Sequence, residues 1–386
     1  MRNGWVETTF GEAFNIQQGK TLAINKLKGG KYPVYGANGV VGYFDEYNFD
    51  FPVTGLGCRG SCGTIYHINE KAFLANNVMA IWEKDSSRIE SRFIPLALTN
   101  VDLVASGAIS GQVQPQITKQ GLEPVPIKIP PLLEQKRIVD LISSVDSYIE
   151  ALQQQLMSAK KSRNAVLHEL MTAGGDDWVE TTLGEAAEVI MGRQLSPSKK
   201  LGTRPRPYIR AANIGSWGIN LEDIYEMDFT EIEEERFACQ VGDTILVEGG
   251  NEKSVGCPAL ITEKESGLCI QNTVIRSRSR NSKALDPNFQ YHLLRFMFWR
   301  GDFAQLCAGT TIMHLGQKRA EVVPISIPPL GEQLNIVDTI SKFDSAVTYS
   351  EETLISAKSL RSGLLSELLS GEHLIPSSYD KVIGAA

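Results

Sequence analysis

The 386-residue sequence predicts an α+β protein with a pseudo-two-fold tandem repeat, in which two globular domains are separated by two long antiparallel coiled-coil helices. Three observations support this prediction. Residues 5–13 (WVETTFGEA) recur at 178–186 with eight of nine positions identical. Residues 129–143 (IPPLLEQKRIVDLIS) recur at 327–341 with eleven of fifteen identical. Each copy of this second motif opens a segment whose apolar residues repeat in heptads, which is typical of a coiled coil.

In chain order, the repeats predict five parts. They are a first globular domain over 1–126, a first long helix over 127–173, a second globular domain over 174–326, a second long helix over 327–372 and a flexible tail over 373–386. The entry motifs are 173 residues apart and the helix motifs 198, so the second globular segment is 25 residues longer. A duplicated frame with dissimilar contents suggests that the two domains recognise different things.

The first globular segment is rich in glycine and in short β-prone runs, such as 32–47 and 54–68, which predict strands and tight turns. Residues 93–100 suggest a short helix. Further on, Gln112, Gln114 and Gln116 alternate with other residues, so an extended chain would place three amides on one face. A Gln amide can pair with adenine in the major groove, although exposed glutamines are also common on ordinary surfaces.

Each long helix is expected to begin after a Pro-Pro pair, because a first-turn residue needs no intrahelical N–H. About 41 residues at 1.5 Å each give a rod of roughly 60 Å. Two arginines, Arg163 and Arg361, interrupt the apolar positions; they either fix the register and dock a partner or extend out of the interface. The predicted seam consists of Ile138, Ile142, Val145, Ile149, Leu152, Leu156, Ala159, Arg163, Val166 and Leu170 in the first helix, and Ile336, Ile340, Phe343, Val347, Ser350, Leu354, Ala357, Arg361, Leu364 and Leu368 in the second.

The second globular segment has the same texture. Residues 207–215, 241–250 and 269–280 predict strands and turns, while 289–307 form an apolar amphipathic stretch that indicates a core helix rather than a cofactor site. Between the first helix and this segment, 172–178 predict a short flexible joint.

Positive charge is segregated, although the net charge is −7. Residues 189–221 carry six cations and no acid, whereas 222–235 carry eight acids and no base. Affinity for phosphate depends on where cations lie, so a basic stretch in an acidic protein is compatible with nucleic-acid binding; a solvated surface with chance clustering is the alternative. The candidate DNA-contacting residues are Lys20, Lys26, Lys28, Lys31, Arg59, Gln112, Gln114, Gln116, Arg193, Lys199, Lys200, Arg204, Arg206, Arg210, Arg276, Arg278 and Lys318.

No catalytic or metal motif is recognisable. The six cysteines fit neither a disulfide framework nor paired zinc knuckles, and the five histidines show no triad or ligand spacing. Phosphate-binding loops and methyltransferase signatures are also missing. We therefore expect a non-catalytic protein without a metal site. Because no apolar run reaches the length of a membrane span and no signal peptide precedes the first motif, a cytoplasmic location without membrane partners is expected.

The combination of YPVYGANGVVGY (32–43) with the first IPPLLEQ helix, and of YIRAANIG (208–215), VGDTILVEGG (241–250) and GTTIMHLGQ (309–317) with the second, resembles the specificity subunit of type I restriction-modification enzymes. The resemblance covers about residues 5–372. It implies two target-recognition domains that each read one half of a split DNA site, helices that set the spacer, docking of two methylation subunits, and a translocating nuclease subunit. S-adenosylmethionine, ATP and Mg would belong to those partners, so this chain is expected to hold no cofactor.

Two other interpretations remain. The chain could be an assembly adaptor whose coiled coil is the active part and whose globular domains bind protein. It could also be an enzyme with an unrecognised acid–base cluster. Salt-dependent, sequence-selective binding to duplex DNA would favour recognition over the adaptor.

Overall fold

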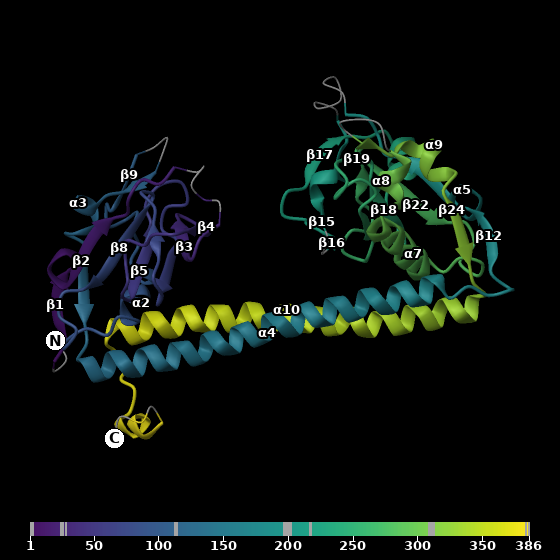
Figure 1. Ribbon diagram of the computed structural model, residues 1–386. Helices are drawn as coiled ribbons and strands as arrows, with labels where there is room; N and C mark the ends of the chain where they lie inside the picture. The colour runs from purple at the N-terminus through teal and green to yellow at the C-terminus, as the bar shows by residue number, and fades with distance from the viewer. Residues whose placement is uncertain are drawn as a thin grey trace. The chain divides into compact units, whose positions relative to one another are not determined.

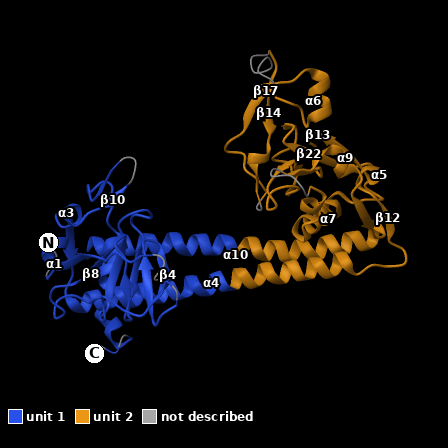
Figure 2. Cartoon of the chain, turned by 45° about the horizontal axis from the view of Figure 1, so that its top comes forward, with its two compact units in different colours: residues 1–154, 351–386 blue, residues 155–350 orange. Residues whose placement is uncertain are grey.

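The computed structural model describes residues 4–23, 27, 29–111, 115–195, 203–215, 218–307, 313–382 and 384. The chain divides into two compact units, residues 1–154 with 351–386 and residues 155–350 (Figure 2). Each unit therefore contains one globular domain together with part of each long helix. Within the described residues, none of the helices combines the length and the apolar character that a membrane span requires.

The first unit is built from a four-stranded sheet, a three-stranded sheet, two two-stranded sheets and short helices, together with parts of the long helices (Figure 1). Its elements are β1 (Val6–Thr9), α1 (Phe10–Ala13), β2 (Phe14–Gln18), β3 (Tyr32–Gly36), β4 (Gly39–Phe44), β5 (Val53–Gly57), β6 (Ile65–Ile68), β7 (Phe73–Leu74), β8 (Val78–Glu83), α2 (Phe93–Thr99), β9 (Ile109–Ser110), β10 (Gln116–Ile117), α3 (Lys119–Leu122), β11 (Pro126–Ile129), the start of α4 (Leu132–Thr172), the end of α10 (Leu330–Ser370) and the 3₁₀ helix η4 (Ser377–Lys381). The short helix expected over 93–100 is confirmed as α2.

The second unit has the same organisation with additional pieces. Its globular elements are β12 (Val179–Thr182), α5 (Leu183–Ala186), β13 (Ala187–Met191), β14 (Pro205–Ile209), the 3₁₀ helix η3 (Ala211–Asn213), β15 (Ile214–Gly215), β16 (Gly218–Ile219), β17 (Tyr225–Asp228), α6 (Glu231–Phe237), β18 (Thr244–Val247), β19 (Gly249–Gly250), β20 (Pro258–Leu260), β21 (Cys269–Ile270), β22 (Val274–Ser279), α7 (Pro287–Arg300), α8 (Asp302–Leu306), β23 (Met313–His314), α9 (Gly316–Glu321) and β24 (Pro324–Ile327). The apolar stretch 289–307 is helical and largely buried, but Gly301, at φ 87°, separates α7 from α8.

Sheet topology confirms the duplication. The four-stranded sheet has the order β2-β8-β5-β6 in the first unit and β13-β22-β18-β20 in the second. The three-stranded sheets, β4-β3-β7 and β17-β14-β21, correspond in the same way. The entry strand pairs antiparallel with the strand before the long helix in both units, with Val6 opposite Ile129 and Val179 opposite Ile327. The predicted fold class is therefore confirmed.

The near-identical entry motifs have a local explanation. The Thr9 hydroxyl accepts a hydrogen bond from the Glu12 N–H while the Glu12 carboxylate accepts one from the Thr9 N–H, and Thr182 with Glu185 repeats this capping box. A hydrogen bond from the Thr8 hydroxyl lowers the pKa of the Glu12 carboxyl. The intervening glycine is required by close packing, since a side-chain carbon at Gly11 would lie 2.9 Å from Glu123.

The glutamine of the IPP motif fixes the start of each long helix to its globular domain. Gln135 is fully buried; its amide donates to the carbonyls of Arg88 and Pro130, each at 2.8 Å, and accepts from the Glu90 N–H at 2.9 Å. Gln333 makes the same three bonds, donating to the carbonyls of Ala284 and Pro328 and accepting from the Asp286 N–H. One side chain thus pairs with three backbone groups in each unit, one of the three hydrogen bonds being buried and two part-buried.

The two long helices pair antiparallel within each unit (Figures 1 and 2). Every predicted seam position is buried or half-buried. Both seam arginines find a carboxylate on the other helix: Arg361 binds both oxygens of Asp146 in the first unit, and Arg163 lies 3.3 Å from Asp344 in the second. These two pairs are equivalent in the repeat, because 146 and 344 differ by the same 198 residues as 163 and 361. The arginines therefore act as register contacts and do not merely extend out of the interface.

Each core combines a globular domain with both long helices. In the first unit Phe10, Phe14 and Phe93 pack in one cluster with Ile138 of α4 and Leu365 of α10. The second unit repeats this arrangement with Leu183 and Phe289 against Leu167, Ile336 and Ile340. The long helices are thus part of both cores and not a separate rod beside them.

Within the tail that we expected to be flexible (373–386), Ile375, Tyr379 and Asp380 contact the start of α4. Ile375 is buried, and its N–H donates to Glu134. Arg137 binds both oxygens of Asp380 at 2.6 and 2.7 Å, and the Tyr379 hydroxyl donates to Asp140. The sequence pattern could not reveal this docking, because the partners lie about 240 residues apart and belong to no repeat. Gly371 also packs against the Trp5 ring, so the entry segment of the first unit lies at the end of α10.

Candidate nucleic-acid interface

The described arginines of the basic stretch in the second domain pair with carboxylates of the acidic stretch that follows it. Strand β14 pairs antiparallel with β17, which places Arg206 opposite Met227 and brings α6 beside the arginines. Arg204 and Arg206 each bind Glu234, at 2.6 and 2.7 Å. Hydrogen bonds from these two guanidinium groups, first that of Arg206, lower the pKa of the Glu234 carboxyl. Both arginines are half-buried, so they remain reachable but are already paired.

Two further arginines of this stretch also have internal partners. Arg193 is buried, lies 2.9 Å from Glu233 and stacks over the Phe229 ring. Arg210 binds Asp223 and stacks over Tyr225. The four described arginines of this stretch are therefore engaged in ion pairs and ring contacts, and their contact with DNA stays a prediction. Local charge counting missed this pairing, since the neutralising partners come from the antiparallel neighbour of β14.

Arg276 lies in the interior of the four-stranded sheet, and Arg278, on the same strand, is half-buried. Arg276 is buried and donates to the Arg236 and Ala238 carbonyls and to Glu188. Arg278 binds both oxygens of the buried Asp243 at 2.6 Å. A guanidinium group in the core cannot reach a phosphate while the domain is folded, so we withdraw Arg276 as a DNA contact. Lys26, Lys28, Gln112, Gln114, Lys199 and Lys200 lie outside the described residues.

In the first unit, the structure brings Arg59 and Gln116 together. They face each other across an antiparallel bridge, and the next residue, Ile117, donates its N–H to the Cys58 carbonyl at 3.0 Å. Arg59 is exposed and Gln116 half-buried. Lys20 and Lys31 are exposed elsewhere, on the segments after β2 and before β3, with Lys31 over the Tyr32 ring. An exposed cation beside an amide is suitable for contacts with a phosphate and with a base edge.

The same position in the second unit is the antiparallel pair of β19 and β23, two short strands that are distant in the sequence. Gly249 faces His314, and Leu315 donates its N–H to the Glu248 carbonyl at 2.8 Å, as Ile117 does to Cys58. The His314 side chain is 60% exposed, and its Nδ1 lies 3.0 Å from Glu248. On α9, Lys318 is exposed and Arg319 donates to the His314 carbonyl. Sequence reasoning named Lys318 but missed His314, although aligning the helix repeats places it at the position of Gln116.

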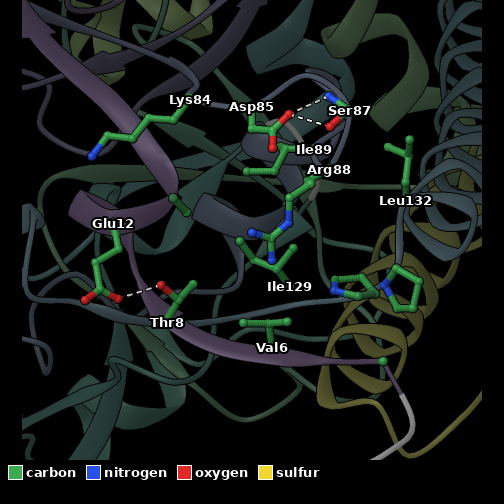
Figure 3. A pocket seen from close by; sticks show the side chains of 14 residues that line it. Val6, Thr8, Glu12, Lys84, Asp85, Ser87, Arg88, Ile89, Ile129 and Leu132 are labelled. Carbon is green, nitrogen blue, oxygen red and sulfur yellow. Dashed lines mark hydrogen bonds between the residues drawn. The ribbon is translucent and has the colours of Figure 1, made fainter.

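A pocket of about 490 Å³ lies at the base of the first domain (Figure 3). Val6, Thr8 and Ile129 of the paired strands line it, with Arg88 directed toward them and Leu132 at the start of α4. Its walls come mainly from the repeated motifs, together with residues of the loop 84–89, and we do not assign it to base recognition. Across the described ranges, no three His, Cys, Asp or Glu side chains gather as they would around a metal ion.

Comparison with known proteins shows which family both halves of the chain are similar to. The family model described as "Type I restriction modification DNA specificity domain" matches residues 2–160 and 175–357. A putative type I restriction enzyme specificity subunit of Haemophilus influenzae is 24% identical over 329 residues, covering 82% of this chain and 81% of that protein. The MjaVIII specificity subunit of Methanocaldococcus jannaschii is 18% identical over 338 residues, covering 81% and 76%.

Solved structures show the same fold. The crystal structure of the type I restriction-modification S subunit of M. genitalium matches with a TM-score of 0.58 at 18% identity, covering 96% of this chain and 97% of that one. A chain from a structural study of complex assembly and conformational transition in a type I R-M system matches with a TM-score of 0.59 at 15% identity, covering 96% and 98%. Since the family model matches both halves of the sequence, this chain belongs to the type I restriction-modification DNA specificity family.

Proposed function

We propose that this chain is the non-catalytic DNA sequence-recognition subunit of a type I restriction-modification complex, and that each globular domain reads one half of a split, asymmetric DNA site. The observation that carries the proposal is a pair of equivalent antiparallel bridges, each between two segments that are distant in the sequence. The backbone arrangement is the same in both units, while the residues at the bridge differ, with Arg59 and Gln116 in one and Gly249 and His314 in the other. A common scaffold with different polar side chains is suited to reading two different base sequences.

The proposal assigns the chemistry to partner subunits. Two methylation subunits would dock on the long helices and the adjoining frame, and a restriction and translocation subunit would join them. S-adenosylmethionine, ATP and Mg would be bound by those subunits. The duplicated frame supports two equivalent docking faces, because the capping boxes and the buried glutamines are repeated in each unit.

The long helices would set the distance between the half-sites. Inserting one heptad in both helices preserves the seam register and lengthens each by roughly 10 Å. At about 3.4 Å per base pair, the spacer should grow by about three base pairs. The adaptor interpretation is not favoured, because the match to the DNA specificity family covers both globular domains.

The test is to express this chain with the methylation subunit encoded beside it and to map modified adenines in the host DNA. A split motif with two unlike halves is expected. If the complex purified intact but methylated no defined motif and bound duplex DNA without sequence preference, the proposal would be wrong.

A further inference from the structure

We infer that His314, held in place by Glu248, is a specificity-determining residue that contacts a base in the half-site read by the second domain. This inference rests on the proposed function and names one residue through which it works. It starts from the equivalence of two antiparallel bridges, Arg59 with Gln116 and Gly249 with His314, which is visible in the backbone hydrogen bonds.

Backbone hydrogen bonds to the neighbouring segments hold Glu248, the residue that precedes β19, on both of its edges. Glu248 donates its N–H to the Thr273 carbonyl at 2.9 Å, and its own carbonyl accepts from Leu315. In the first unit Cys58 donates to Asn77 and accepts from Ile117 in the same way. His314 and Gln116 therefore occupy one scaffold position, each just before a short helix, α9 or α3.

The residues around His314 also differ from those at the equivalent positions of the first unit. The residue opposite is Gly249, where a side-chain carbon would lie 2.9 Å from the imidazole Nδ1. The imidazole therefore occupies the space that a side chain at this position would need, whereas the first unit has Arg59 at the equivalent position. The residue before it is Glu248, whose side chain is only 13% exposed and lies 3.0 Å from Nδ1. A nearly buried carboxylate fixes the ring more firmly than a solvated one, because it has little freedom to move.

This arrangement leaves the other nitrogen available. With Nδ1 donating to Glu248, the Nε2 of a neutral imidazole is an acceptor. In the major groove, the exocyclic amino groups of adenine and cytosine are the donors that such an acceptor can recognise. Lys318 on α9, which follows β23, and Lys253 in the turn after β19 are both exposed. Their ammonium groups could bind the phosphates of the same DNA segment. An exposed His–Glu pair adds little stability by itself, so a purely structural role explains the arrangement poorly.

The test uses the complete complex with its methylation subunit and sequencing of modified adenine. His314→Ala should relax recognition at one position of one half-site, with discrimination there falling about ten- to a hundred-fold, and leave the other half-site unchanged. Glu248→Gln, which keeps an acceptor for Nδ1, should retain the motif better than Glu248→Ala. His373→Ala is the matched control, since His373 is 68% exposed and lies in the tail.

An unchanged motif in an active His314→Ala complex would overturn the inference. If methylation is lost altogether, binding of the purified complex to a library of half-site variants decides: selective loss at one position supports a base contact, and equal weakening on all sequences rejects it. Absence of any motif in the unsubstituted complex would instead reject the proposed function.

Discussion

The four-stranded sheets of the two units share one topology but are stabilised by different chemistry. In the first unit, Val53, Ala80 and Trp82 make this part of the sheet apolar. At the equivalent positions, the second unit has Asp243, Arg276 and Arg278, of which Asp243 and Arg276 are buried. The Asp243 carboxylate lies 2.6 Å from the Arg278 guanidinium and 3.9 Å from that of Arg276. A buried ionic group thus replaces an apolar one without changing the strand order. The repeated motifs and long helices are held by their own contacts. The globular segments 14–126 and 187–324 can therefore differ in sequence without changing the strand order.

The largest difference in stability between the units should appear when the side chains at these positions are truncated to alanine. Asp243→Ala leaves Arg276 and Arg278 without their shared carboxylate, and breaking a buried charge pair costs about 3–5 kcal/mol. Val53→Ala removes only apolar contacts and should cost about 2 kcal/mol. Hydrogen exchange of the β22 and β8 amides would separate the two effects, since a chain of two units need not unfold in one step. Unchanged exchange in β18 and β22 after Asp243→Ala would show that the ionic group is dispensable.

The frame should behave alike in both units. Gln135→Leu and Gln333→Leu each remove one buried and two part-buried hydrogen bonds to the backbone, so each should cost about 2–3 kcal/mol. The loss should be local: the Glu90 amide should exchange faster in the first variant and the Asp286 amide in the second. A large effect in one unit and none in the other would mean that the equivalent hydrogen bonds do not have equivalent roles.

These two cases show what could be predicted from the sequence. The long helices, their seam and the duplication follow from local signals: heptad spacing, Pro-Pro starts and repeated motifs. The buried glutamines were visible as part of a motif, but their role was not, because their backbone partners in the loops 84–90 and 280–286 lie more than 40 residues away.

The candidate interface was predicted less well. Counting charges along the chain identified Arg204, Arg206 and Arg210 as a basic surface, yet their carboxylate partners lie on α6 and beside β17. A strand pairing of this kind is not visible in a local window. Aligning the two halves residue by residue would have found His314, because that signal lies in the repeat itself.

A smaller difference is expected at the seam. Asp344 binds both Arg163 and Arg295, whereas the equivalent Asp146 binds only Arg361 among the described contacts and is more exposed. Asp344→Ala should therefore cost about 1–3 kcal/mol and Asp146→Ala under about 1 kcal/mol. Thermal unfolding at two salt concentrations would rank them. A larger effect of Asp146→Ala would contradict this assignment.

The smallest effect concerns the tail, which has no counterpart in the second unit. Arg137→Ala should release residues 375–381 to proteolysis, whereas Asn335→Ala, at the repeat-equivalent position, should not. The hydrogen bond from Arg137 lowers the pKa of Asp380. A lowered pKa stabilises docking at pH above the ordinary carboxyl value, and this contribution is lost as the pH falls through the lowered pKa. Proteolytic release that did not increase in acid would argue against this ion pair.

The central claim is that each globular segment reads its own half-site independently. The most direct test replaces residues 187–324 with a second copy of 14–126, joined at equivalent positions of the frame, and maps the methylated motif. If the claim is correct, the motif becomes an inverted repeat of the half-site read by the first domain. A motif that keeps both original halves, or an intact complex whose new motif contains neither, would contradict it.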